Sequence, residues 1–139
     1  MRFMVIVHPV SATDWEAGKM PDPAEMAAMG TFNEQLIDAG VMLMGEGLQP
    51  SSAGTRITFA GGKPAKVTPG PFSTPEERVG GFWIWQCASQ EEAVEWAKKA
   101  PMGEGDILEI RKIMESSDFG EEVEQEENKL REKMAKRGA

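Results

Sequence analysis

The chain has very few of the residues that build disulfides, metal sites or basic binding surfaces. Cys87 is its single cysteine and His8 its single histidine among 139 residues. An intramolecular disulfide is therefore excluded, and a closed metal site would need several carboxylate ligands. Basic residues number 15 against 23 acidic ones, which gives a formal charge of −8. That charge argues against nucleic acids and anionic membrane surfaces as partners, because both require a concentrated basic face.

Long apolar runs and nucleotide-binding motifs are also missing. The N-terminal segment MRFMVIVHPV is too short to span a membrane and lacks a small-residue cleavage site. We therefore expect no membrane segment and a cytoplasmic location. The sequence has no GxSxG elbow, and residues 54–63 (GTRITFAGGK) lack the spacing of a phosphate-binding loop. We expect neither a metal nor a cofactor.

The residues that are present predict one domain with two unusual strands. The composition, 40% hydrophobic and 27% charged, is ordinary for a globular chain of this length. Residues 2–8 (RFMVIVH) and 81–87 (GFWIWQC) are apolar on both alternating faces, which is typical of strands that are covered on both sides. Shorter strands are expected at four further segments, residues 41–48, 55–60, 65–68 and 106–113.

Capping motifs predict where the helices begin. Asp22, followed by Pro23 and Glu25, starts a helix that Gly40 ends. Ser89 and Glu92 form a second capping motif, and Pro101 ends that helix. A third helix is expected from Asp118, with glutamates at its start, basic residues at its end and a thin apolar face. We therefore divide the chain into a domain over residues 1–114 and a helical extension over residues 115–139.

The order β-α-β-β-(β)-β-α-β predicts an α+β fold of the ferredoxin-like, split βαβ type. In that plan the two central strands are residues 2–8 and 81–87, and both helices cover the same face of the sheet. The other face would stay bare in a single chain, and a large bare apolar face promotes aggregation. We therefore expect a homodimer in which the sheet faces of two copies pack together.

Several motifs resemble the YCII-related, DGPF-domain proteins. They are "GEGLQP" at 45–50, "GPF" at 70–72, "GGFW" at 80–83, "EEAVEWA" at 91–97, "LEIRKI" at 108–113 and "DFGEE" at 118–122. The resemblance implies a dimeric α/β barrel built on the ferredoxin-like plan. It also implies a largely uncharacterised family, in which some members look like enzymes and others are associated with alternative sigma factors.

The loop that names this family is altered in the present chain. Pro69 stands where the family has Asp, Thr74 replaces the acid that follows, and Glu76 replaces a Lys. A catalytic role of that Asp does not transfer to this chain. The residues that do match the family pattern are Glu46, Glu77, Gly80, Gly81, Glu109 and Arg111.

Three polar residues are candidates for catalysis or ligand binding. His8, at a strand end, is either a general base or an ordinary strand-end histidine. Glu46 lies among Met42, Met44 and Leu48 and is either a site carboxylate or a structural partner of an arginine. Arg111 shares a strand face with Glu109 and either binds an anionic group or forms a paired interface charge.

Aromatic residues suggest where a ligand would be held. Trp83 and Trp85 share one strand face, where they either stack on a ligand or pack in the core or dimer interface. Phe72 and Glu77 belong to a proline-stiffened loop that would form a pocket wall. Cys87, with no adjacent base in the sequence, is expected to be a small buried apolar residue.

These observations favour a protein that binds, or slowly transforms, a small apolar or aromatic molecule between its sheet and helices. The alternative is a non-catalytic accessory protein that acts through protein contacts, with a sigma factor as one possible partner. A ligand-binding protein requires an open pocket with converging polar groups. An accessory protein predicts a filled pocket and an apolar patch outside the dimer face.

Overall fold

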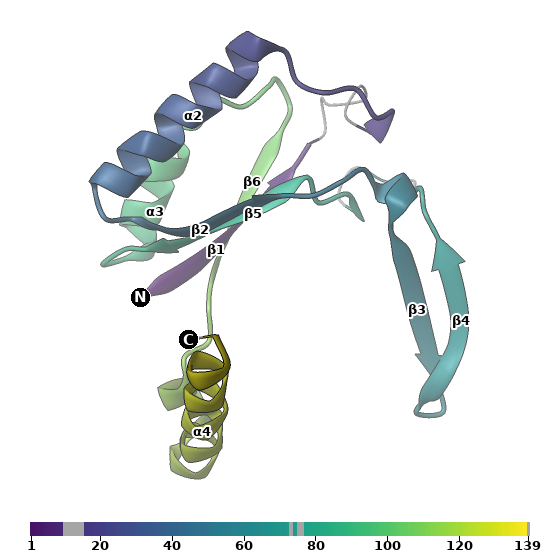
Figure 1. Cartoon of the computed structure of the whole chain (residues 1–139), viewed down its shortest axis with the longest axis vertical. Helices are drawn as coiled ribbons and strands as arrows, with labels where there is room; N and C mark the ends of the chain where they lie inside the picture. The colour runs from purple at the N-terminus through teal and green to yellow at the C-terminus, as the bar shows by residue number, and fades with distance from the viewer. Residues whose placement is uncertain (10–15, 73, 75–76, 139) are drawn as a thin grey trace.

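The computed structural model of the protein describes residues 1–9, 16–72, 74 and 77–138 (Figure 1). It contains a four-stranded antiparallel sheet in the order β2-β5-β1-β6. The strands of this sheet are β1 (Arg2–His8), β2 (Met42–Gly47), β5 (Gly81–Gln86) and β6 (Ile107–Lys112). The expected central positions of the first strand and of the strand at 81–87 are therefore confirmed.

The remaining elements lie on either side of this sheet. Helices α2 (Pro23–Asp38) and α3 (Gln90–Ala97) cover one face, as Figure 1 shows. A separate hairpin consists of β3 (Thr55–Ala60) and β4 (Lys63–Pro69). The C-terminal helix α4 (Glu121–Gly138) follows a short 3-10 helix, η3 (Ser116–Phe119), and another 3-10 turn, η1 (Ser51–Ala53), precedes the hairpin.

The helices begin where their capping residues predict. The Asp22 carboxylate accepts a hydrogen bond from the Glu25 amide at 2.9 Å, and the Glu25 side chain accepts from the Asp22 amide in return. The Ser89 hydroxyl accepts from the Glu92 amide, but the Glu92 carboxylate accepts from Ala88, one residue before the cap. In this second capping motif the Glu92 side chain therefore bonds to the amide of the residue before the N-cap, not to the amide of the N-cap itself.

The core lies between the sheet and helices α2 and α3. Trp85 of β5 is fully buried, and its ring lies 5.6 Å from that of Trp83 and 6.2 Å from that of Phe32 of α2. The other buried members of this cluster are Phe3, Val5, Leu36, Val41, Cys87 and Ala93. The interpretation of Cys87 as a buried apolar residue is confirmed, and burial raises the pKa of its thiol.

The opposite sheet face carries an ordered grid of side chains, which we call the open face. One row across the four strands is Glu46, Phe82, Ile6 and Glu109. The next row is Met44, Ile84, Met4 and Arg111. Its centre is thus apolar and its two edges are charged, and helices α2 and α3 do not cover it (Figure 1).

Three expectations about side-chain direction need correction. Trp85 was a candidate for the dimer face, but it packs in the helix-covered core, and Phe82 is the aromatic residue of the open face. Met42 does not share a face with Glu46, because the register of β2 shifts between Met42 and Met44. The three- and four-residue spacing of apolar residues over 26–37 predicts that Ile37 lies on an apolar stripe of α2, yet Ile37 is 59% exposed.

The hairpin and α4 both extend away from the sheet on its open-face side (Figure 1). They leave it at opposite ends of the strands, the hairpin after β2 and α4 beyond the end of β6. Arg2 of β1 donates two hydrogen bonds to Glu115, at 2.9 and 3.0 Å, and so ties the sheet to the segment before α4. This ion pair lowers the pKa of Glu115, chiefly through the hydrogen bonds from Arg2.

Candidate functional site

A cavity of about 380 Å³ lies between α2 and one end of the sheet. This volume falls in the lower part of the range typical of small-molecule sites. The cavity is lined by residues from β1, β2, α2 and β5 and from the segments beside them: Val7, Pro9, Pro21, Met29, Asn33, Gly45, Glu46, Gly47, Gly80, Gly81, Phe82 and Trp83. Most of this surface is apolar, so the cavity suits an apolar ligand.

Glycines form one wall of the cavity because the backbones approach closely there. A Cβ atom on Gly81 would lie 2.7 Å from the carbonyl oxygen of Glu46 on the neighbouring strand. A Cβ atom on Gly45 would lie 2.9 Å from the indole ring of Trp83. The backbone of β5 therefore approaches β2 closely at Gly81, and larger residues at Gly45 and Gly81 would displace the wall.

Asn33 supplies an oriented polar group to the cavity. The indole Nε1–H of Trp83 donates a hydrogen bond of 2.9 Å to the Asn33 side-chain oxygen. Because the Asn33 side-chain oxygen accepts from the indole, both N–H groups of the Asn33 side-chain amide remain available to donate to other acceptors. The pair therefore provides an aromatic surface beside a hydrogen-bond donor.

Glu46 borders the cavity from the edge strand β2, and its side chain is exposed. Its register partner is Phe82, so the strand pleat directs it toward the open face rather than toward the helices. The ion pairs found among the described residues do not include Glu46. The alternative interpretation, a carboxylate paired with an arginine of the same chain, therefore has no support in that part of the structure.

His8 and Arg111 meet the same carboxylate on the open face. The Nε2 atom of His8 lies 3.0 Å from Glu109 Oε1, and Arg111 Nε lies 3.7 Å from Glu109 Oε2. His8 is almost fully buried, and its Nδ1 atom has no hydrogen-bond partner among the described residues. The structure thus unites His8 and Arg111 through Glu109 and separates both from the cavity lining.

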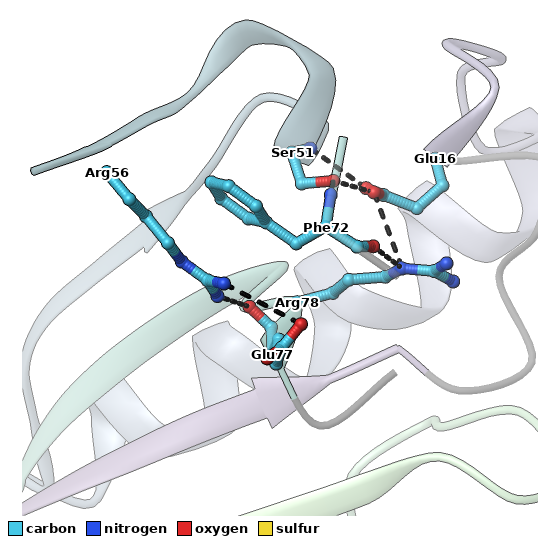
Figure 2. A network of polar contacts seen from close by, with 6 residues as sticks. All are labelled: Glu16, Ser51, Arg56, Phe72, Glu77 and Arg78. Carbon is cyan, nitrogen blue, oxygen red and sulfur yellow. Dashed lines mark hydrogen bonds and ion pairs between the residues drawn. The ribbon is translucent and has the colours of Figure 1, made fainter. Parts of the chain in front are cut away.

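Phe72 and Glu77 belong to a second polar network, around the proline-rich loop (Figure 2). The Glu16 carboxylate accepts hydrogen bonds from the Ser51 hydroxyl and amide, and Arg78 lies 3.6 Å from the same carboxylate. The Ser51 hydroxyl accepts from the Phe72 amide, and Arg78 donates to the Phe72 carbonyl at 3.1 Å. These contacts fix the backbone of the loop on both sides of Phe72.

The Phe72 ring completes this network. The Arg56 guanidinium carbon lies 3.6 Å from the centre of the ring, and the same side chain pairs with Glu77 at 3.6 Å. Phe72 and Glu77 line a second cavity of about 340 Å³, together with residues of the 3-10 turn η1. The altered position Pro69 is exposed at the end of β4, where it faces Thr55 of β3.

The network also perturbs the titration of Glu16. Burial acts to raise the pKa of Glu16, but hydrogen bonds from Ser51 and the charge of Arg78 outweigh it and hold the pKa below its usual value. A hydrogen bond from the Thr74 side chain is the main cause of the lowered pKa of Glu77. Both carboxylates are therefore held in the ionised form.

Two kinds of site find no support within the described residues. No group of three or more His, Cys, Asp or Glu side chains is placed there to hold a metal ion. None of the helices described is both long enough and apolar enough to cross a bilayer.

The comparison with known families identifies the chain. Residues 1–117 match the YCII-related domain, so the chain belongs to the YCII-related family. No curated protein matches the sequence. A solved structure with a similar arrangement is 5-chloro-2-hydroxyhydroquinone dehydrochlorinase from Burkholderia phenoliruptrix AC1100, in complex with 2,5-dihydroxybenzoquinone. It shares 16% sequence identity and has a TM-score of 0.40, over 82% of this chain and 96% of that chain.

Proposed function

We propose that this protein binds a small, largely apolar organic molecule in the cavity between α2 and the sheet. The observation that carries the proposal is the open cavity of about 380 Å³, with apolar walls and the Asn33–Trp83 pair at its side. A single aromatic ring can contact the exposed part of Trp83, which is 5% exposed, and an oxygen atom on that ring can accept a hydrogen bond from the Asn33 amide. A phenol or a cyclic ketone has this combination of groups.

Charge narrows the proposed ligand class. Glu46 is the sole titratable side chain among the described residues that line the cavity, and the chain carries a formal charge of −8. Both features disfavour an anionic ligand such as a benzoate. We therefore propose a neutral ligand, with Trp83 providing a contact surface and Glu46, whose side chain turns to the open face, disfavouring carboxylates through its charge alone. In this proposal Phe72 and Glu77 hold the loop, and Trp85 supports Trp83 from the core.

His8, Glu46 and Arg111 stay proposed as polar groups for any slow chemistry on the open face. When the Glu109 carboxylate accepts the Nε2–H of His8, the Nδ1 atom carries the lone pair. The cavity itself lacks such an acid–base pair among its described lining residues. Binding rather than turnover is therefore the function that we assign to the cavity.

We also propose that two copies pack through their open faces, forming a ferredoxin-like dimeric α/β barrel. The apolar centre of the grid, made of Met4, Ile6, Phe82 and Ile84, supports this assembly because a bare apolar sheet face is unfavourable in water. The single cysteine, which rules out an intramolecular disulfide, supports a cytoplasmic location. The alternative function, an accessory protein acting through contacts, predicts a filled pocket, which disagrees with the open cavity, and an apolar patch outside the dimer face, which the exposed Ile57, Phe59 and Val67 of the hairpin would supply.

Calorimetric titration with a panel of phenols, cyclic ketones and benzoates tests the proposed function. We expect the neutral compounds to bind to the wild type and Met29→Trp, which fills the cavity, to weaken that binding at least tenfold. Met26→Trp is the matched control, because Met26 is 56% exposed on the same helix and does not line the cavity. Glu46→Gln should improve the binding of benzoates and leave phenols unchanged. Equal binding to both methionine variants would place the ligand elsewhere.

A further inference from the structure

The carboxylate of Glu16 joins three separate segments of the chain. It accepts hydrogen bonds from the hydroxyl and the amide of Ser51, and Arg78 Nε lies 3.6 Å from it (Figure 2). We call these contacts the Glu16 junction. The Glu16 side chain is 12% exposed and that of Arg78 is 22% exposed, so the junction is largely shielded from water. Charge-assisted hydrogen bonds in such surroundings are stronger than those at an exposed surface.

Each of the three joined segments continues into the lining of the cavity between α2 and the sheet. The lining residues that the segments reach within a few positions are Pro21, Gly47 and Gly80. Glu16, Ser51 and Arg78 do not line that cavity themselves. The junction therefore lies outside the cavity and connects three parts of its wall.

Two of these segments are also tied to each other directly. The Leu48 amide donates a hydrogen bond of 2.9 Å to the Gly80 carbonyl, and the Gly80 amide donates one of 2.9 Å to the Val7 carbonyl. The segments that contain Ser51 and Arg78 are thus held to the main sheet by backbone hydrogen bonds. The third segment, residues 16–21, joins them through Glu16.

This third segment has few other attachments. Residues 17–22 are all exposed, and Pro21, which lines the cavity, therefore lies at its rim. Within the described part of the chain, no side-chain hydrogen bond or ion pair holds residues 17–21. The next fixed point is the Asp22 cap of α2. A segment with so little buried surface opens easily when one end is released, so loss of the Glu16 junction would loosen the Pro21 side of the rim.

We propose that Glu16 is a positioning residue for ligand binding, which holds residues 16–21 at the rim of the cavity and so keeps the cavity in its binding form. This inference rests on the proposed function and adds a residue, outside the lining, on which affinity depends. A ligand that needs the segment in place binds more weakly in proportion to the fraction of molecules that keep this form. Loosening of the rim should also admit small molecules to the cavity more readily.

Quenching of tryptophan fluorescence by acrylamide tests the inference without a ligand. Trp83 lines the cavity and is 5% exposed, so a small neutral quencher reaches it more often when the rim opens. All chains in this test carry Trp15→Phe, which removes the tryptophan next to Glu16 in the sequence. The contribution of Trp83 is the difference from chains that also carry Trp83→Phe. We expect Glu16→Ala to raise the quenching constant of Trp83 about twofold.

Glu115→Ala is the matched control. Glu115 also accepts hydrogen bonds from an arginine, Arg2, but it precedes η3 and does not line the cavity. Its loss should leave the quenching of Trp83 unchanged. Circular dichroism checks that each variant is folded. If Glu16→Ala does not fold, Ser51→Ala takes its place: it removes one donor of the junction and should raise the quenching by a smaller amount, and no rise would overturn the inference.

Titration with phenol, or with the neutral panel compound that the wild type binds most tightly, gives the second readout. Glu16→Ala should raise the dissociation constant about tenfold, as expected when about a tenth of the molecules keep the binding form, and Glu115→Ala should not change it. If either the quenching or the affinity is unchanged in Glu16→Ala, the positioning role is overturned and the cavity still stands as the proposed site. A wild type that binds no compound of the panel overturns the proposed function, and the quenching then decides alone whether Glu16 holds the rim.

Discussion

Glu16 shows how one side chain can hold three segments together. Its carboxylate contacts Ser51 and Arg78, and both of these residues bond to the backbone of Phe72. The sequence gives no local sign of this role, because Glu16 is 35 residues from Ser51. The wall of the second cavity therefore depends on a long-range ion pair rather than on the prolines of the loop alone.

The lowered pKa of Glu16 makes a prediction about acid stability. A carboxyl group whose pKa is lower in the folded state stabilises the fold above its unfolded value, and this contribution is lost as the pH falls through the folded value. Wild-type stability should therefore drop as the pH falls below the ordinary glutamate value of 4.5. Glu16→Gln should be less stable than the wild type at pH 7, and the difference between the two should shrink toward pH 3.

Chemical denaturation at a series of pH values measures this difference. Glu34→Gln, a change at an exposed position of α2, controls for the loss of one negative charge. If Glu16→Gln and the wild type lose stability in parallel down to pH 3, Glu16 does not contribute through its ionised form.

Some site residues could be predicted from the sequence, and others could not. Trp83 and Glu46 were both predicted, since aromatic residues and an isolated carboxylate in strands stand out in a pattern. Asn33 was missed because it lies among polar neighbours on a helix and acquires its role through Trp83, 50 residues away. Glu109 was seen on the same strand face as Arg111, but its contact with His8 depends on the register between β1 and β6.

At the scale of helices and strands, the capping residues in the sequence were the most reliable basis for prediction. The Asp22 cap, the Ser89 cap and the left-handed Gly40 mark helix ends in the sequence and in the structure alike. The prediction failed for Met42, where strand pairing interrupts the alternation of side chains along β2. The register shift in β2 moved Met42 to the other face of the sheet, because its alignment is set by pairing with β5.

The boundary proposed at residue 114 can be tested by two truncations. A chain ending at Met114 loses Glu115 and leaves Arg2 without its partner, whereas a chain ending at Gly120 keeps that ion pair and η3. We expect both to fold, with the shorter chain less stable by about 1 kcal/mol than the longer one. Thermal unfolding at one protein concentration compares the two. Equal stability of the shorter chain and the full-length protein would show that residues 115–139 do not support the domain.

At the scale of the whole molecule, we expect the open face to determine whether the protein is a monomer or a dimer. Phe82 and Ile84 lie at its centre and are only partly covered in a single copy. Phe82→Glu would place a carboxylate in the proposed interface and should yield a monomer or insoluble protein. Light scattering at micromolar concentration distinguishes these results from a dimer. Met26→Glu, at an exposed position of α2 on the other side of the sheet, is the control, and a dimer of unchanged mass with Phe82→Glu would show that the copies do not meet there.

The most direct test of the central claim is a crystal structure of the wild-type protein soaked with a neutral phenol that binds in solution. We expect density for the ring against Trp83, with the phenol oxygen about 2.7 to 3.2 Å from the Asn33 amide nitrogen. Density between α2 and the sheet would establish the cavity as the binding site. A cavity filled by its own side chains, or a phenol bound only outside it, would contradict the account.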